Sequence, residues 1–359
     1  MRARSVASSP PALADRQPEE GPAVVARSRH RKSGWAWWLA ALTYVAFAGV
    51  TIATMQSGLH GDPRTTNPHP GPAPYGPFLG FDRWPTVIAI SSVPLTLGLA
   101  GTLIFLSVRQ GRVHWSVIVA IAGLFTGALD PLANWATFAE FDPRMLHFPL
   151  SWHYLNISPL LEPALSFLGG YACYYLLYGI GLLHGHARLI APRIPASSWL
   201  GRHPLVATFG GAFVLAIPMN GVLQLMWMKI GIFVYTEGVG PLIHLGNVQL
   251  PLIMIVYDCF IFAMVAVLCV RDAEGDLLVI GCLARRLPGH RGSASAGRQL
   301  GIAIPLLLTV VAVPLSVLAL LRAAGLAHPA YDRFPYPSVK VYDPYGDLQH
   351  AGKPGPFYR

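Results

Sequence analysis

Charged side chains are scarce in this chain of 359 residues. Asp, Glu, Lys and Arg make up 12% of it, whereas hydrophobic residues make up 53%. An ordinary soluble domain has about 25% charged residues. The mean hydropathy is +0.47. These values exclude a disordered chain, argue against a soluble enzyme and favour an integral membrane protein built from apolar helices.

Cysteine is also scarce, with four residues in the whole chain. Cys173, Cys259 and Cys269 lie in apolar runs, Cys282 lies in a basic loop, and no C-x-x-C pair occurs. Such spacing is not typical of a disulfide framework or a redox motif. We therefore expect the four cysteines to be free packing residues.

Several functional motifs are missing as well. The sequence has no P-loop, no Rossmann glycine pattern and no G-x-S-x-G nucleophile elbow. The last apolar run lacks the lysine of a retinal protein, and no histidine lies in the middle of a run, as bis-histidine haem would require. The pair His184 and His186 lacks the further histidines of a membrane di-iron site. We expect no metal and no cofactor. Because no two halves of the chain repeat, a transporter with inverted repeats is less favoured, although seven helices do not forbid one.

Seven apolar runs are each long enough to cross a bilayer, which takes about 20 helical residues. They are Trp35–Met55, Thr86–Val108, Trp115–Phe138, Pro159–Leu183, Pro204–Leu225, Leu250–Val270 and Leu300–Leu321. The shorter stretch Leu277–Leu283 is predicted to be an interfacial turn. The fold class predicted is all-α: a polytopic membrane protein in which residues 34–324 form a bundle of seven transmembrane helices.

The positive charges are distributed unevenly between the two sides of this bundle. Over alternate loops, seventeen Lys and Arg residues fall on the side of the N-terminus, and four fall on the other side, namely Arg64, Arg83, Arg144 and Lys229. Cytoplasmic loops carry the excess of Lys and Arg in membrane proteins. The count predicts a multi-pass protein of the cell (plasma) membrane with its N-terminus in the cytoplasm and its C-terminus outside.

The segments that flank the helices differ in composition. Residues 1–33 are rich in Arg, Pro and Ser and predict a disordered basic tail. The apolar run that follows is longer than that of a signal peptide and is expected to be a retained helix. Residues 325–359 form a predicted external tail rich in aromatics and Pro. This tail and the outer segments 57–85 and 139–158 are either mobile loops or a cap over the outer mouth.

Three carboxylates fall inside the apolar runs, where ionisable side chains are expensive and are candidates for function. Asp130 and Asp258 each lie eight residues from the predicted outer end of a helix, a depth of about 12 Å at 1.5 Å per residue. Glu162 is predicted to lie shallower, one turn into the fourth helix. We predict that Asp130, Glu162 and Asp258 are catalytic residues that line one outward-opening polar pocket, roofed by the outer segments.

Uncharged polar and aromatic residues lie at the same depth. Asn134 shares a helix face with Asp130, and Asn220 and Gln224 have the same four-residue spacing. The predicted substrate-binding residues are Asn134, Trp135, Asn220, Gln224 and Tyr257. Structural alternatives remain open: Asp130 could satisfy a kink at Pro131, and the other carboxylates and amides could serve packing or the membrane interface. The stripe Tyr171, Tyr174, Tyr175 and Tyr178 is interpreted as packing.

A pocket of this kind suits acid–base chemistry without a cofactor. A carboxyl group in apolar surroundings has a raised pKa and can act as a general acid. A second carboxylate in a different setting can act as base or stabilise positive charge. A substrate hydroxyl could then be protonated and expelled as water, and an internal hydroxyl or alkene could attack the resulting cation.

The stretch Asp130-Pro131-x-x-Asn134-Trp135, the seven apolar runs and the aromatic, Pro-rich outer segments resemble the AveC-like spirocyclase family of actinobacterial membrane proteins. The resemblance covers about residues 35–345. It implies dehydration and spiroketal formation on a polyketide, although the substrate of the family's namesake does not transfer to this chain. No set of catalytic residues is carried over from the family.

These observations predict a spirocyclase- or dehydratase-like membrane enzyme that cyclises or dehydrates a hydrophobic, oxygenated polyketide or lipid. Asp130 is the first choice for the acid, with Glu162 or Asp258 as charge partner. The expected partners are a lipophilic small molecule and membrane lipid, and no nucleic acid. A non-catalytic lipid-binding or transport protein and an accessory membrane subunit are the alternatives.

Overall fold

A computed structural model describes residues 35–55, 77–142, 144–149, 152, 162–164, 170–246, 248–286, 295–330, 341–342, 346–352 and 357–358. The predicted basic tail of residues 1–33 lies outside these residues, as does about half of the predicted external tail. In the described residues the chain is mostly helical.

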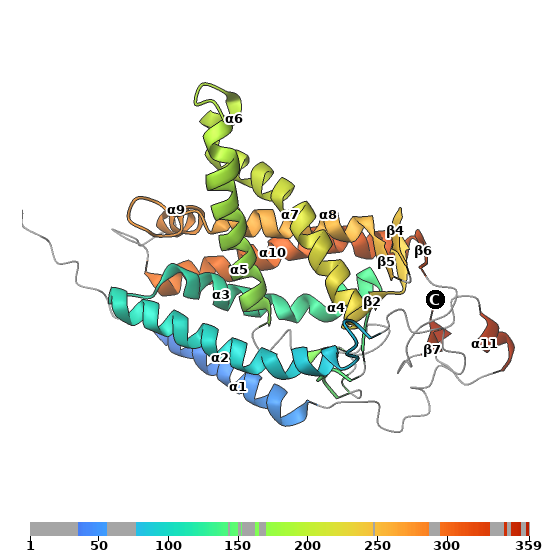
Figure 1. Cartoon of the computed structure of the whole chain (residues 1–359). Helices are drawn as coiled ribbons and strands as arrows, with labels where there is room; N and C mark the ends of the chain where they lie inside the picture. The colour runs from blue at the N-terminus through green and yellow to red at the C-terminus, as the bar shows by residue number, and fades with distance from the viewer. Residues whose placement is uncertain are drawn as a thin grey trace, which may run out of the picture. The chain divides into compact units, whose positions relative to one another are not determined.

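Each of the seven apolar runs contains an α-helix (Figure 1). These helices are α1 (Trp35–Thr54), α2 (Trp84–Gln110), α3 (Trp115–Thr126) followed by α4 (Asp130–Thr137), α5 (Gly170–Gly185), α7 (Pro204–Lys229), α8 (Leu252–Leu268) and α10 (Ala296–Ala323). Within the described residues, four segments are long and apolar enough to cross a membrane: α2, α3 with α4, α7 and α10. The apolar helix α8 has 17 residues. The composition of the long helices is that of a membrane protein.

The helices around α5 and α8 form the packed part of the molecule. Helix α3 packs against α5 and α10, α5 packs against α8, and α8 packs against α7. Glycines allow two of these approaches. A Cβ atom at Gly123 would lie 3.1 Å from the backbone oxygen of Tyr171, and one at Gly179 would lie 2.8 Å from a methyl group of Val265. Helix α5 is therefore held closely against α3 on one side and α8 on the other.

Helix α2 is anchored much less. Its buried residues are Pro85, Ala89 and Ser92, and most of its apolar side chains are exposed. Apolar side chains exposed along a helix are favourable only where the surroundings are themselves apolar, as in lipid. Helix α2 therefore presents a wide lipid-facing surface.

The predicted third span is one apolar segment with an interruption. A 3₁₀ turn, Gly127–Leu129, separates α3 from α4. Pro131 lies in the first turn of α4, where its missing N–H leaves no helical bond unmade. The helix ends at Phe138, which adopts a left-handed conformation at φ 55°. The interruption places Asp130 at the start of a new helix rather than within a continuous one.

The fourth helix begins later than predicted, and Glu162 does not lie in it. Glu162 and Pro163 are non-helical, and Pro163 pairs with His147 in an isolated β-bridge. The N–H of Phe148 donates to the carbonyl of Glu162 at 3.1 Å. Pro163 explains the error, because the residue before a proline is disfavoured in the helical conformation. Helix α5 is described from Gly170 onward.

The all-α prediction is also incomplete, because short antiparallel strands join the ends of several helices. The pairs are β1 (Ala139–Phe141) with β2 (Phe233–Tyr235), β3 (Glu237–Val239) with β6 (Ala327–Pro329), and β4 (Leu242–Leu245) with β5 (Val248–Pro251). These strands supply hydrogen-bond partners for the backbone N–H and C=O groups where the helices end. An irregular loop would leave such groups unpaired in a place without water. A side-chain clamp helps to hold the segment after β1: Arg144 pairs with the buried Asp142 at 2.7 Å and also donates to the carbonyl of Asp82.

The opposite ends of the helices carry the basic loops. Arg112, after α2, pairs with Asp276, after α8, at 3.0 Å, so these two loops lie together. The stretch predicted as an interfacial turn is instead the helix α9 (Leu278–Arg286). All four cysteines are free, as predicted. The remaining elements are a π-helix (His186–Ile190), a 3₁₀ turn (Ala191–Arg193), α6 (Trp199–Arg202), α11 (Asp347–His350) and the parallel pair β7 (Val341–Tyr342) and β8 (Phe357–Tyr358).

Candidate functional site

A cavity of about 430 Å³ lies beneath the β1–β2 pair, between the packed helices and α2. It is lined by α2, α3, α4, α5, α7, α8, β1 and β2, with one contact from α10. Five of the predicted site residues line it, namely Asp130, Asn134, Gln224, Tyr257 and Asp258. Of the three carboxylates predicted to line one pocket, Asp130 and Asp258 line this cavity and Glu162 does not. The walls are largely apolar and aromatic, so the pocket is less polar than predicted.

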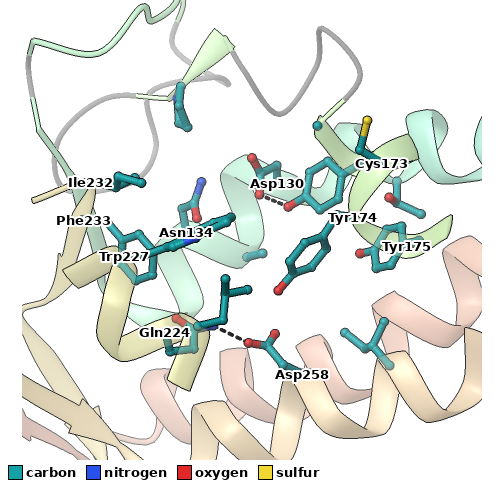
Figure 2. Close-up of a pocket in the computed structure, with 18 of the residues that line it drawn as sticks. Asp130, Asn134, Cys173, Tyr174, Tyr175, Gln224, Trp227, Ile232, Phe233 and Asp258 are labelled. Carbon is teal, nitrogen blue, oxygen red and sulfur yellow. Dashed lines mark hydrogen bonds between the residues drawn. The ribbon is translucent and has the colours of Figure 1, made fainter. Parts of the chain in front are cut away.

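Asp130 reaches the cavity from the first turn of α4 and contacts α5. The hydroxyl group of Tyr171 donates a hydrogen bond to Oδ1 of Asp130, which is the dashed line at the labelled Asp130 in Figure 2. Oδ2 is buried and has no N–H or hydroxyl donor among the described residues; its neighbour is the carboxyl group of Glu162. A buried carboxyl oxygen without a partner is unfavourable for stability and is retained where function requires it. The predicted alternative, in which Asp130 satisfies the backbone of the Pro131 kink, has no support in these contacts.

Glu162 approaches the same place from the segment before α5. Asn134 donates from Nδ2 to Oε2 of Glu162 at 2.9 Å, and Oε1 is buried without a partner among the described residues. The Glu162 side chain is fully buried. Burial, and then the nearby carboxylate of Asp130, raise the pKa of Glu162 well above its ordinary value. Like charges that close cannot both ionise readily, so Asp130 and Glu162 form an acid pair suited to holding a proton.

Asp258 has a different environment. Its Oδ2 accepts hydrogen bonds from Gln224 Nε2 at 2.5 Å and from Asn220 Nδ2 at 3.3 Å. Gln224 is held in turn by the hydroxyl of Tyr235, at 3.1 Å from Oε1. The four-residue spacing on α7 thus places both amides on the face that meets α8. Asn220 does not line the cavity, and it supports Asp258 from behind.

Trp135 is the other predicted binding residue that lies outside the cavity lining. Its ring lies under the guanidinium group of Arg322 on α10, 4.5 Å from the ring centroid. Trp135 follows Asn134 directly, so it points about 100° further round the helix. This residue packs against α10 instead of facing the cavity.

The cavity walls contain aromatic residues whose role the sequence analysis misjudged or missed. Tyr171, Tyr174, Tyr175 and Tyr178, interpreted as packing, all line the cavity. Their spacing on α5 is that of one helix face, which was the available signal. Trp227 and Tyr235 also line it and carried no comparable signal. Figure 2 shows Tyr174 between Asp130 and Asp258, with its phenol oxygen on the side of the Asp258 carboxyl group.

The site has few conventional catalytic features. Among the described residues, no group of three or more His, Cys, Asp or Glu side chains is arranged to hold a metal ion. Lys, Arg and His do not occur among the described residues that line the cavity. The chemistry available is therefore that of carboxyl groups, amides and phenols. This arrangement defines a membrane-embedded, aromatic-walled cavity with an acidic pair at one end and a single acid at the other.

Comparison with known proteins places the chain in no group: it matches no family model, no curated protein and no solved structure.

Proposed function

We propose that this protein is a spirocyclase- or dehydratase-like membrane enzyme that performs acid–base cyclisation or dehydration of a hydrophobic, oxygenated substrate. The observation that carries the proposal is that Asp130 and Asp258 line one cavity from two different helices, while Glu162 lies behind Asp130, next to its carboxyl group. An intramembrane carboxylate is unfavourable unless it is paired or used, and here two of the three have an oxygen without a partner.

The proposed reaction divides the work between the two ends of the cavity. The Asp130–Glu162 pair donates a proton to a substrate hydroxyl, the C–O bond breaks with its electron pair, and water leaves. An internal hydroxyl oxygen then attacks the cationic carbon, and its proton passes to Asp258. The net change is ring closure with loss of one water. Asp258 then releases its proton to solvent, the acid pair takes one up from solvent, and no cofactor takes part.

The substrate is proposed to be a polyketide or a lipid that enters from the bilayer. Helix α2 supports this route, because Ile88 and Leu95 belong both to the cavity lining and to this weakly anchored, lipid-facing helix. Ser91 and Ser92, which also line the cavity, bond to carbonyl groups of their own helix. Their hydroxyls are thus occupied, and this wall presents little polarity to an apolar substrate.

We further propose the complete topology of a seven-span protein of the cell membrane, with the N-terminus in the cytoplasm and the C-terminus outside. The uneven distribution of Lys and Arg supports this orientation. The contact between Arg112 and Asp276 supports it too, because it joins two loops assigned to the same, cytoplasmic side.

The resemblance to the AveC-like spirocyclase family motivates the reaction class in this proposal. It rests on the Asp130-Pro131-x-x-Asn134-Trp135 stretch, whose first and fifth residues line the cavity. Actinobacterial origin and a polyketide pathway belong to the same proposal.

The test is the chemistry of cells that express the protein or its Asp130→Asn variant. Mass spectrometry of extracted lipids and metabolites should reveal a product lighter than its precursor by one water. The variant should lower its formation at least about 100-fold, since general acid catalysis contributes that much. Asp276→Asn is a matched control, because Asp276 is a carboxylate at the far end of the bundle. Unimpaired product formation by a folded Asp130→Asn protein would refute the assignment.

The cavity also favours one alternative function, a non-catalytic carrier or binder of an apolar ligand. A carrier returns its ligand chemically unchanged, so the same extracts would show altered amounts of a compound and no new mass. An accessory membrane subunit would instead co-purify with a stoichiometric partner and would tolerate Asp130→Asn.

A further inference from the structure

We infer that the cavity is a binding site for a hydrophobic organic monocation, whose charge lies between Asp130 and Asp258 against the aromatic walls. This inference deepens the proposed function and rests on it for the identity of the natural ligand, which would be the cationic species formed during ring closure. The site itself should also bind stable cations of similar size, such as an alkylated cyclic ammonium.

The charges around the cavity have one sign. Asp130 and Asp258 are the charged residues in its described lining, and neither faces a basic group there. Asp130 and Asp258 are 4% and 8% exposed, so water screens them poorly. An anionic ligand would meet only like charges, whereas a cation would meet opposite charges from both ends.

A second observation concerns how each acid is held. Asp130 lines the cavity, and its Oδ2 is buried with no N–H or hydroxyl donor among the described residues, next to the carboxyl group of Glu162. At the other end, the Oδ2 of Asp258 is already bonded to Gln224 and Asn220, which fixes the direction of the carboxyl group. The cavity therefore has one carboxyl group oriented by amides and one carboxyl group that receives no amide hydrogen bond.

The walls between the two acids are aromatic faces. The ring of Tyr171 stacks on that of Tyr175, with 5.4 Å between the ring centroids. The ring centroids of Tyr174 and Tyr178 lie 4.8 Å and 4.2 Å from that of Phe262. Two phenol groups are occupied elsewhere, since Tyr171 bonds to Asp130 and Tyr235 bonds to Gln224. These rings line the cavity, and the negative quadrupole of an aromatic face attracts cations and does not favour anionic groups.

The dimensions and the apolar lining determine the kind of cation. A volume of about 430 Å³ suits a molecule of several rings or one ring with a chain. Leu95, Leu177 and Ile261 add apolar surface to the lining. A small hydrated inorganic cation would leave this surface in contact with water. A ring-borne charge with an alkyl tail satisfies both the acids and the apolar walls.

The experiment measures binding of three matched compounds to the full chain in dodecyl maltoside micelles, with protein-free micelles as background. The compounds are radiolabelled N-dodecyl-N-methylpiperidinium, the neutral ether 2-dodecyltetrahydropyran and the anion 12-cyclohexyldodecanoate. We expect the cation to bind at least about tenfold more tightly than the ether, a difference of about 1.4 kcal/mol. The anion should show no binding above background.

Variants separate the acids from the aromatic faces. Asp130→Asn and Asp258→Asn should each weaken cation binding about tenfold or more and leave ether binding unchanged, because only the cation gains from the charge. Tyr174→Leu should weaken cation binding about fivefold, while Tyr174→Phe, which keeps the ring, stays within about twofold of the wild type. Asp276→Asn should have no effect. Gel filtration identifies variants that fail to fold. If an Asp variant fails to fold, the comparison of Tyr174→Leu with Tyr174→Phe still tests the inference.

The outcomes distinguish this inference from the proposed function. Equal affinity for the cation and the ether, or cation binding unchanged in the folded Asp variants, overturns the inference even if the protein forms a dehydrated product. Selective cation binding without any product in cells supports the inference and refutes the enzymatic proposal.

Discussion

The two ends of the cavity use the same type of residue in opposite ways. At one end, Asp130 and Glu162 share a small volume and keep two carboxyl oxygens without partners. At the other end, Asp258 is held by two amides, one of which is held by Tyr235. At the first end, two carboxyl groups lie close together with few hydrogen-bond donors. At the second end, one carboxyl group has its donors in place. A carboxylate in a membrane can thus be kept for reactivity or for orientation, and its neighbours determine which.

The largest expected effect on stability tests this difference directly. Asp258→Leu should lower the free energy of unfolding by about 2–6 kcal/mol, because it leaves the buried amide groups of Asn220 and Gln224 without their acceptor. Asp130→Asn should change stability little or increase it, because it removes a charge that faces Glu162. Thermal unfolding in detergent measures both. A loss at Asp130 as large as that at Asp258 would contradict the distinction between the two ends.

The pH dependence of stability should come from the acid pair. Glu162 lies before α5, outside the helices, and its raised pKa means that folding favours its protonated form. Its contribution is fully present below the ordinary glutamate value of 4.5 and is lost as the pH rises through the folded pKa. Thermal stability should therefore fall as the pH rises above 4.5, by at most about 1.4 kcal/mol per pH unit for this group.

Glu162→Gln serves as the control for this pH effect. Glutamine has no proton to lose and can still accept the hydrogen bond from Asn134, so its melting profile should be flatter. Asp130→Asn should also flatten the profile, because the charge that helps to raise the pKa is removed. Wild-type and Glu162→Gln profiles that run parallel would show that the pair does not titrate in this range.

The smallest expected effects compare the two tyrosine donors. Tyr171→Phe removes the donor to Asp130, and Tyr235→Phe removes the donor to Gln224. Each should lower the free energy of unfolding by about 1 kcal/mol, the net contribution of one hydrogen bond. Product formation should fall more in Tyr171→Phe, because this phenol touches the proposed acid. Equal losses of product in the two variants would weaken the division of roles between the ends.

The sequence predicted those parts of the molecule that depend on local pattern. The seven apolar runs each contain helix, because apolar composition over about 20 residues is a strong local signal. Counting residues from the predicted helix ends gave Asp130 and Asp258 the same depth, and both residues line the cavity. The spacing of Asn220 and Gln224 similarly placed two amides on one helix face.

The errors come from features that depend on contacts between distant segments. Glu162 was assigned to a helix, although Pro163 gave a local sign against it and His147, far along the chain, pairs with that segment. The strands β1 and β2 lie about ninety positions apart, and neither has a period that reveals its partner. Tyr174 and its neighbours were interpreted as packing, because a helix face of aromatics looks the same whether it meets another helix or a cavity.

The close packing of α5 against α3 and α8 affects which ligands the cavity can select. Gly123 brings α5 against the helix that leads into Asp130, and Gly179 brings α5 against the helix that carries Asp258. The separation of the two acids is therefore set by a rigid spacer, while α2, on the lipid side, can give way. Such a cavity would accept only ligands whose length fits the distance between the two acids, but it would accept ligands of different widths.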